Sequence, residues 1–105
     1  MNKGDNIIFL YTLQNCIYCN EFKGRLKKLE IPYKEIIIDD GSIYNSLLGD
    51  NLEKKYKTEN YPIIEIKNKY LKKAFITKTD LEEQNNIYIF DDIEQLIEQI
   101  KKNEI

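Results

Sequence analysis

The sequence predicts a single α/β domain, residues 1–105, in which helices cover both faces of a mixed β-sheet. Short runs of β-branched and aromatic residues alternate with segments of helical periodicity. Their order is strand, helix, strand, helix, two strands and a helix, which is typical of such a layered sheet. A chain of 105 residues with 42% hydrophobic residues has room for one core. We expect four strands, or five if residues 70–77 add another.

The first three elements form a strand-helix-strand unit. Residues 7–11 (IIFLY) are apolar throughout, which predicts an interior strand buried on both faces. A helix begins near Ile17 and stops before Pro32, and residues 33–38 form a second strand parallel to the first. The helix has an apolar stripe (Cys19, Phe22, Leu26 and Leu29) and an opposite basic face that we interpret as solvated (Lys23, Arg25, Lys27 and Lys28).

A second helix follows the turn residues 39–42, which have the polar side chains that cap helices. Its buried stripe has a spacing of four residues (Leu48, Leu52 and Tyr56). Gly49 weakens this helix by about 1 kcal/mol relative to alanine. The sequence therefore predicts the buried stripe of this helix but not its first residue.

Two more apolar runs, residues 63–66 and 87–90, predict the remaining strands. A final helix starts with Asp91 as its N-cap and Glu94 completing a capping box. Its apolar stripe is regular (Ile93, Leu96, Ile97 and Ile100). The stretch 68–86 is an atypical extended excursion that ends in a polar connection.

Composition and charge argue against several classes of function. The net charge is −2, from 18 acidic and 16 basic residues that are interspersed along the chain, so nucleic acid is not the expected partner. No apolar window reaches the roughly 20 residues of a membrane span, and the first six residues lack the apolar run of a secretory signal. We expect a cytoplasmic monomer that acts without a membrane.

The strongest local signal is the sequence Cys16-Ile17-Tyr18-Cys19 at the junction between the first strand and the first helix. Residues three apart in a helical turn have β-carbons about 5–6 Å apart, close enough to form a disulfide. Cys16 should face the free amides at the helix start, which favour a thiolate. We therefore assign Cys16 as the attacking thiol and Cys19, on the buried stripe, as the resolving thiol.

Two other interpretations of the cysteine pair stay open. A structural zinc site needs four Cys or His ligands, and this chain has two cysteines and no histidine, so a metal would require a second subunit or an external thiol. We therefore expect no metal site. The cysteines can also be two inert buried thiols, although this does not explain their place at a strand-to-helix junction.

The cysteine pair and the segments around it resemble the first half of a glutaredoxin, with viral and phage glutaredoxins as the nearest branch. The resemblance includes Tyr11, the helix to Leu29, Pro32-Tyr33 and the segment 36–39. It continues at Tyr61-Pro62 and at Asp91-Asp92-Ile93, and leaves out 68–86. It implies a thioredoxin-like fold and thiol-disulfide exchange, with no tightly bound cofactor.

The resemblance also implies a binding surface beside the cysteines. Pro62 follows a cis peptide and packs near the pair, and the backbone of Tyr61 binds the cysteine of glutathione or of a substrate peptide. Asp92, helped by Asp91 and the helix start, holds the glutamyl end of glutathione, or is simply a helix cap. Tyr18 contributes substrate surface or only packing.

Some positions depart from the family pattern. Ile17 replaces the usual proline of the motif, and Leu13 and Gln14 stand where a lysine is common. Tyr88 and Ile89 replace a Gly-Gly pair. These changes weaken the case for glutathione binding and leave the exchange chemistry intact, and Lys57 is the cation best placed in sequence to compensate.

The activity expected from the resemblance is reduction of protein disulfides or glutathione mixed disulfides. Glutathione or a thioredoxin reductase would regenerate the dithiol. The alternative is a thioredoxin-fold module that senses redox state or binds a partner with little turnover. The length of the stretch 68–86 favours this alternative somewhat, because long loops are uncommon unless they have a function.

Overall fold

The computed structural model describes residues 6–77, 79–82 and 84–104. They form five strands and three helices in the expected order. The strands are β1 (Ile7–Thr12), β2 (Lys34–Ile37), β3 (Ile63–Lys67), β4 (Lys72–Ile76) and β5 (Ile87–Ile89), and the helices are α1 (Ile17–Lys28), α2 (Ile43–Tyr56) and α3 (Ile93–Glu104).

The strands form one mixed sheet in the order β2-β1-β3-β4-β5. β1 pairs parallel with β2, as predicted, and antiparallel with β3. β4 is antiparallel to β3 and parallel to β5. β1 is therefore an interior strand, and β3 is the middle strand of the five.

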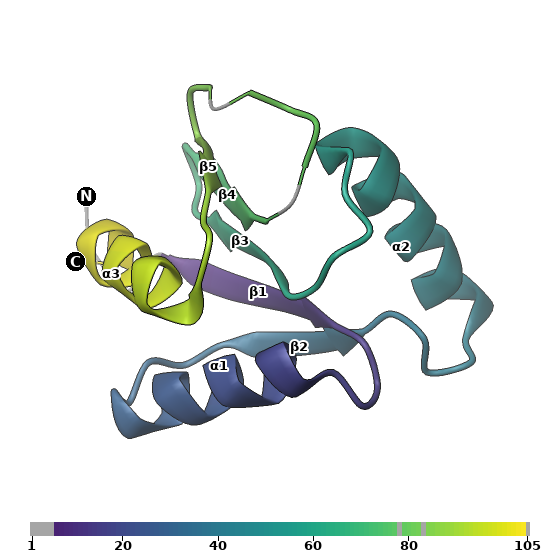
Figure 1. Cartoon of the computed structure of the whole chain (residues 1–105), viewed down its shortest axis with the longest axis horizontal. Coiled ribbons are helices and arrows are strands. Elements are labelled where there is room, and N and C mark those ends of the chain that lie inside the picture. The colour runs from purple at the N-terminus through teal and green to yellow at the C-terminus, as the bar shows by residue number, and fades with distance from the viewer. Residues whose placement is uncertain (1–5, 78, 83, 105) are drawn as a thin grey trace.

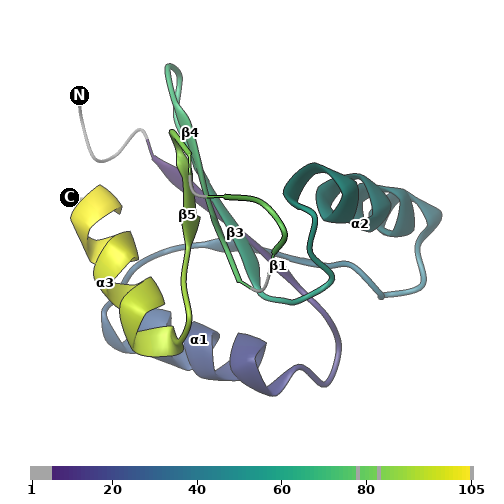
Figure 2. The same ribbon diagram turned by 45° about the horizontal axis from the view of Figure 1, so that its top comes forward.

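Helices cover both faces of the sheet, which confirms the predicted layers (Figure 1). α1 and α3 lie side by side on one face, and α2 lies on the other (Figure 2). Alternate residues of β1 serve the two cores, because side chains of a strand point to opposite faces. Leu10 packs in the core under α1 and α3, whereas Tyr11 packs in the core under α2.

Two boundary predictions are wrong. Ile7 is 42% exposed although its whole run was expected to be buried, because it is the first residue of β1 and packs in neither core. Leu29 is also 42% exposed, because α1 ends at Lys28 and Leu29 is its C-cap. Two residues of the expected basic face are partly buried and paired: Lys23 with Glu35 and Arg25 with Glu94.

The cap of α3 lies one residue later than predicted. The carboxylate of Asp92 accepts the amide hydrogen of Gln95 at 2.9 Å, and the side-chain oxygen of Gln95 accepts the amide hydrogen of Asp91 at 2.8 Å. Asp92 and Gln95 therefore share the capping contacts, in place of Asp91 and Glu94. This register leaves the carboxylate of Glu94 free to pair with Arg25 of α1.

The stretch 68–86 contains regular structure. The side-chain oxygen of Asn68 accepts the amide hydrogens of Tyr70 and Leu71, which closes a tight turn between β3 and β4. β4 lies within the segment 70–77 that was expected to add a fifth strand. The connection after β4 is tied to the end of α2, where the hydroxyl of Thr79 donates to backbone oxygens of residues 56 and 57.

A carboxylate is buried in the middle strand of the sheet. Glu65 is 2% exposed, and the hydroxyls of Tyr11 and Tyr56 both donate to it. Lys67 and Lys72 lie 3.3 and 3.7 Å from its two oxygens. Burial by itself raises the pKa of Glu65, but the two hydroxyls and then the lysines outweigh it and hold the pKa below its usual value. Glu65 is therefore an ionised, fully partnered group that links β1, β3 and α2.

Candidate functional site

The cysteine pair lies at the start of α1, just after the turn that connects it to β1. Cys16 is the N-cap residue of α1, with an extended backbone conformation, and Cys19 lies in the first turn. A disulfide joins them, with the two Cα atoms 5.2 Å apart. Asn15, just before the pair, has a left-handed backbone with a φ of 58°, which reverses the chain between strand and helix.

The two sulfurs have different surroundings. Cys16 is half-buried, whereas Cys19 is fully buried against the core under α2. The amide of Cys19, which has no backbone partner within the helix, donates to the Sγ of Cys16 at 3.1 Å. The expected difference in exposure is confirmed, and the electrostatic field of the helix start acts on Cys16.

The segment before β3 approaches the same sulfur from the other side. The Tyr61-Pro62 peptide is cis, as expected, and the carbonyl oxygen of Tyr61 lies 3.9 Å from the Sγ of Cys16. The Tyr61 hydroxyl donates to Glu53 of α2 at 2.7 Å. Burial and then the bond to Glu53 raise the pKa of this tyrosine, so it stays protonated and holds the segment against α2.

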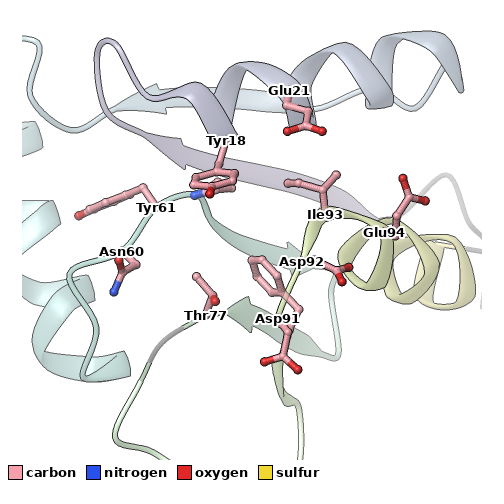
Figure 3. A pocket seen from close by; sticks show the side chains of 11 residues that line it. Tyr18, Glu21, Asn60, Tyr61, Thr77, Asp91, Asp92, Ile93 and Glu94 are labelled. Carbon is pink, nitrogen blue, oxygen red and sulfur yellow. The ribbon is translucent and has the colours of Figure 1, made fainter.

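A cavity of about 450 Å³ is lined by Tyr18 of the cysteine motif and by Tyr61, whose carbonyl lies close to Cys16 (Figure 3). Its walls come from α1, from the segment before β3 and from the start of α3 (Figure 3). All five residues that were predicted to bind glutathione or substrate line it: Tyr18, Tyr61, Pro62, Asp91 and Asp92. The fold thus gathers residues from three distant parts of the chain around one space of the size that small ligands occupy.

Sequence reasoning missed six other residues of this cavity: Glu21, Asn60, Thr77, Phe90, Ile93 and Glu94. Glu21 could have been found, because it lies three residues after Tyr18 and therefore on the same side of α1. Thr77 and Phe90 follow the paired residues Ile76 and Ile89 of parallel strands, so their position depends on a pairing that the sequence does not specify.

Acidic side chains provide all the charge in the cavity wall formed by the described residues. These are Glu21 on α1 and Asp91, Asp92 and Glu94 at the start of α3. Arg25 forms two hydrogen bonds with Glu94, at 2.5 and 3.1 Å, and this pairing lowers the pKa of Glu94. No lysine or arginine side chain is among the described lining residues.

The residues considered as replacements for the missing lysine lie elsewhere. Lys57 is the C-cap of α2, with a left-handed φ of 50°, and lines a separate hollow with acidic neighbours. Gln14 is hydrogen-bonded to Asp39 through its amide groups, and Leu13 packs against the core under α2. The structure therefore brings none of the three to the cavity wall.

Comparison with known families settles the relationship. A model of the family described as glutaredoxin matches residues 8–71. The chain belongs to the glutaredoxin family. The five-stranded mixed sheet with three helices is consistent with the thioredoxin-like fold of these proteins. No curated protein matches the sequence.

The glutaredoxin match has a definite extent along the cavity. It includes the cysteine pair, Tyr18, Glu21 and the Tyr61-Pro62 segment, and it ends before β4. The acidic wall at the start of α3 therefore lies outside the matched residues. Together, the family and the adjacent cysteines support a thiol redox function.

Among the described residues, no helix combines the length and apolar character needed to cross a bilayer. The described side chains also contain no group of three or more histidine, cysteine or acidic residues arranged to hold a metal ion.

Proposed function

We propose that this protein is a thiol-disulfide oxidoreductase that reduces protein disulfides or glutathione mixed disulfides through Cys16 and Cys19. The observation that carries the proposal is the asymmetric pair itself. Cys16 caps α1, accepts the amide hydrogen of Cys19 and lies 3.9 Å from the carbonyl oxygen of Tyr61, a residue of the cavity wall, whereas Cys19 is buried. Such an arrangement suits one attacking and one resolving sulfur.

The first step is attack by the Cys16 thiolate on one sulfur of the substrate disulfide. A bond forms between that sulfur and Cys16, the substrate disulfide breaks, and the other sulfur leaves as a thiolate that takes up a proton. The amide of Cys19 and the start of α1 stabilise negative charge on Cys16, which makes the thiolate available. The carbonyl of Tyr61 borders the same sulfur and positions the incoming chain.

In the second step, the Cys19 thiolate attacks the sulfur of Cys16 and releases the substrate thiolate, which is protonated. The substrate has then gained two electrons and two protons, and the protein has formed the Cys16–Cys19 disulfide. Two molecules of glutathione, which become one glutathione disulfide, or a thioredoxin reductase return the protein to the dithiol. The cycle requires no tightly bound cofactor, and it suits a monomer in a reducing compartment such as the cytoplasm.

Glutathione would occupy the cavity with its cysteine against the backbone of Tyr61 and its glutamyl end near Asp91, Asp92 and the amides of α3. Tyr18 would form one side of the site. The carboxylates of glutathione would meet no lysine or arginine among the described lining residues. We therefore propose weak glutathione binding.

A lysine introduced at Glu21 tests this point, because Glu21 is exposed and lines the cavity. We expect the apparent KM for glutathione to fall by up to about fivefold, as for an exposed charge pair, and the fall to shrink at high salt. Glu21→Gln is the control for loss of the carboxylate. Saturation of the unaltered protein at low glutathione would contradict weak binding.

A steady-state assay tests the proposed function as a whole. Reduced protein is mixed with excess glutathione mixed disulfide, glutathione and a coupled reductase, and turnover is followed. Many cycles per molecule support the enzyme, and a single stoichiometric event supports the sensor or binding module. The case for that module depended on the long excursion, and β4 now accounts for part of it.

A further inference from the structure

We infer that the cavity lined by Tyr18 and Tyr61 selects polypeptide disulfides in which lysine or arginine lies next to the reacting cysteine, in preference to disulfides of anionic thiols such as glutathione. The inference rests on the proposed exchange at Cys16. It concerns which disulfides react fastest, and it follows from the charge and shape of the cavity.

The cavity is lined by residues that neighbour the reacting sulfur. Tyr61 lines the cavity and also places its carbonyl oxygen 3.9 Å from the Sγ of Cys16. Tyr18, inside the motif, lines the same space. A substrate whose sulfur is joined to Cys16 and whose backbone runs past Tyr61 therefore places its neighbouring residues at the mouth of this cavity.

The charge of the cavity wall is negative, and one nearby cation, Arg25, compensates only part of it. Glu21, Asp91 and Asp92 form no salt bridge among the described residues; Arg25 pairs with Glu94 and is also close enough to Glu21 to interact with it electrostatically. Glu21 faces the start of α3 from α1, so carboxylates flank the space from two elements (Figure 3). A cationic side chain entering between them gains attraction from both walls.

The uncharged part of the wall also suits a cation. The ring of Tyr18 lines the cavity and is exposed, and tyrosine faces attract ammonium and guanidinium groups. Glutathione, with two carboxylates and one ammonium group, brings net negative charge into an acidic space. A lysine-flanked or arginine-flanked peptide brings the opposite charge, so the two substrate classes should differ in rate.

Three model peptides test the inference directly. They share one sequence in which the two residues that flank a central cysteine are Lys, Gln or Glu, and each cysteine is joined to 2-nitro-5-thiobenzoate. Attack by reduced protein on the peptide sulfur forms the mixed disulfide with Cys16 and releases the coloured thiolate, so a single reaction gives the second-order rate constant. The same peptides with 2-mercaptoethanol correct for intrinsic reactivity.

We expect the lysine peptide to react about five- to twentyfold faster than the glutamate peptide at low salt, because each exposed charge pair changes the rate by up to about fivefold. The ratio should fall toward one in high salt. Glu21→Gln and Asp91→Asn should each lower the ratio. Asp92 is left unchanged because its carboxylate caps α3.

Glu98→Gln is the matched control. Glu98 is an exposed acid of α3 that does not line the cavity, so its neutralisation changes net charge equally and should leave the ratio unaltered. Equal corrected rates for the three peptides, or a ratio that Glu98→Gln lowers as much as Asp91→Asn, would overturn the inference while leaving the exchange activity established. Absence of release from all three peptides would overturn the proposed function and the inference with it.

Discussion

Gly49 of α2 makes a packing contact whose energetic effect can be separated from helix propensity. A methyl group added at Gly49 would lie 2.4 Å from the Cγ2 of Ile38, whereas one added at Gly24 of α1 would meet no atom within 4 Å. Ile38 is 7% exposed, and its β-branched methyl cannot swing aside as the end of a long side chain would. Gly49→Ala should therefore force α2 away from the strand end that it covers.

The two glycines give opposite expectations. Gly24→Ala should stabilise the protein by about 0.5–1 kcal/mol, the usual gain in a helix interior. At Gly49 the same gain is set against an overpacking cost of about 1–3 kcal/mol, so we expect a net loss of up to about 2 kcal/mol. Urea unfolding of the oxidised proteins, analysed by linear extrapolation, measures both values.

A second substitution shows whether Ile38 is the cause. Ile38→Leu removes Cγ2 and keeps the volume, so Gly49→Ala should cost less in that background than in the original chain. The double-mutant cycle gives the coupling free energy between positions 38 and 49. If Gly49→Ala stabilises the protein as much as Gly24→Ala does, the close approach of α2 to Ile38 is refuted.

Further stability predictions concern Glu65 and Lys57. Glu65→Gln should lower the free energy of unfolding by about 1.5–3 kcal/mol in urea titrations, because a charged acceptor for two tyrosine hydroxyls is lost. Because folding lowers the pKa of Glu65, its ionised carboxylate contributes fully to the free energy of unfolding above the pKa of an unfolded glutamate, near 4.3, and the contribution is lost as the pH falls through the lower pKa of the folded protein. Acid should therefore destabilise Glu65→Gln less than the original protein. Lys57→Gly should raise the melting temperature, because Lys57 has a left-handed backbone that costs residues other than glycine about 1–2 kcal/mol. An unchanged or lower melting temperature would argue against that conformation.

Much of the fold was predictable because the apolar patterns are strong. The stripe on α3 and the β-branched runs of β1 and β3 have one interpretation each, and their order implies the layers. β4 was harder to predict, because its lysines interrupt the apolar pattern. The paired neighbours of β4 and β5 could not be derived from local sequence.

The cap of α3 shows why a correct motif can have the wrong register. Asp91 and Asp92 are adjacent, and each has an acid or amide three residues later, so both satisfy the capping pattern. A tertiary contact distinguishes the two registers, because only the later one leaves the carboxylate of Glu94 free to pair with Arg25, 69 residues away in the sequence. The burial of Glu65 was also unpredictable from local sequence, because its partner Tyr11 is 54 residues distant.

The cysteine pair was predictable because its geometry is local, whereas the cavity was predictable only through family resemblance. Spacing and helix position were enough to distinguish the capping Cys16 from the buried Cys19. The meeting of Tyr18, Tyr61 and Asp91 depends on the whole sheet being assembled.

The most direct test of the central claim compares Cys16→Ser with Cys19→Ser in turnover of a glutathione mixed disulfide and of a protein disulfide. We expect Cys16→Ser to abolish both activities, because the attacking sulfur is gone. Cys19→Ser should lose protein disulfide reduction and keep part of the glutathione reaction, because external glutathione can resolve the mixed disulfide at Cys16. Near-normal turnover by Cys16→Ser, or preferential alkylation of Cys19 in the reduced protein at neutral pH, would contradict the assigned roles.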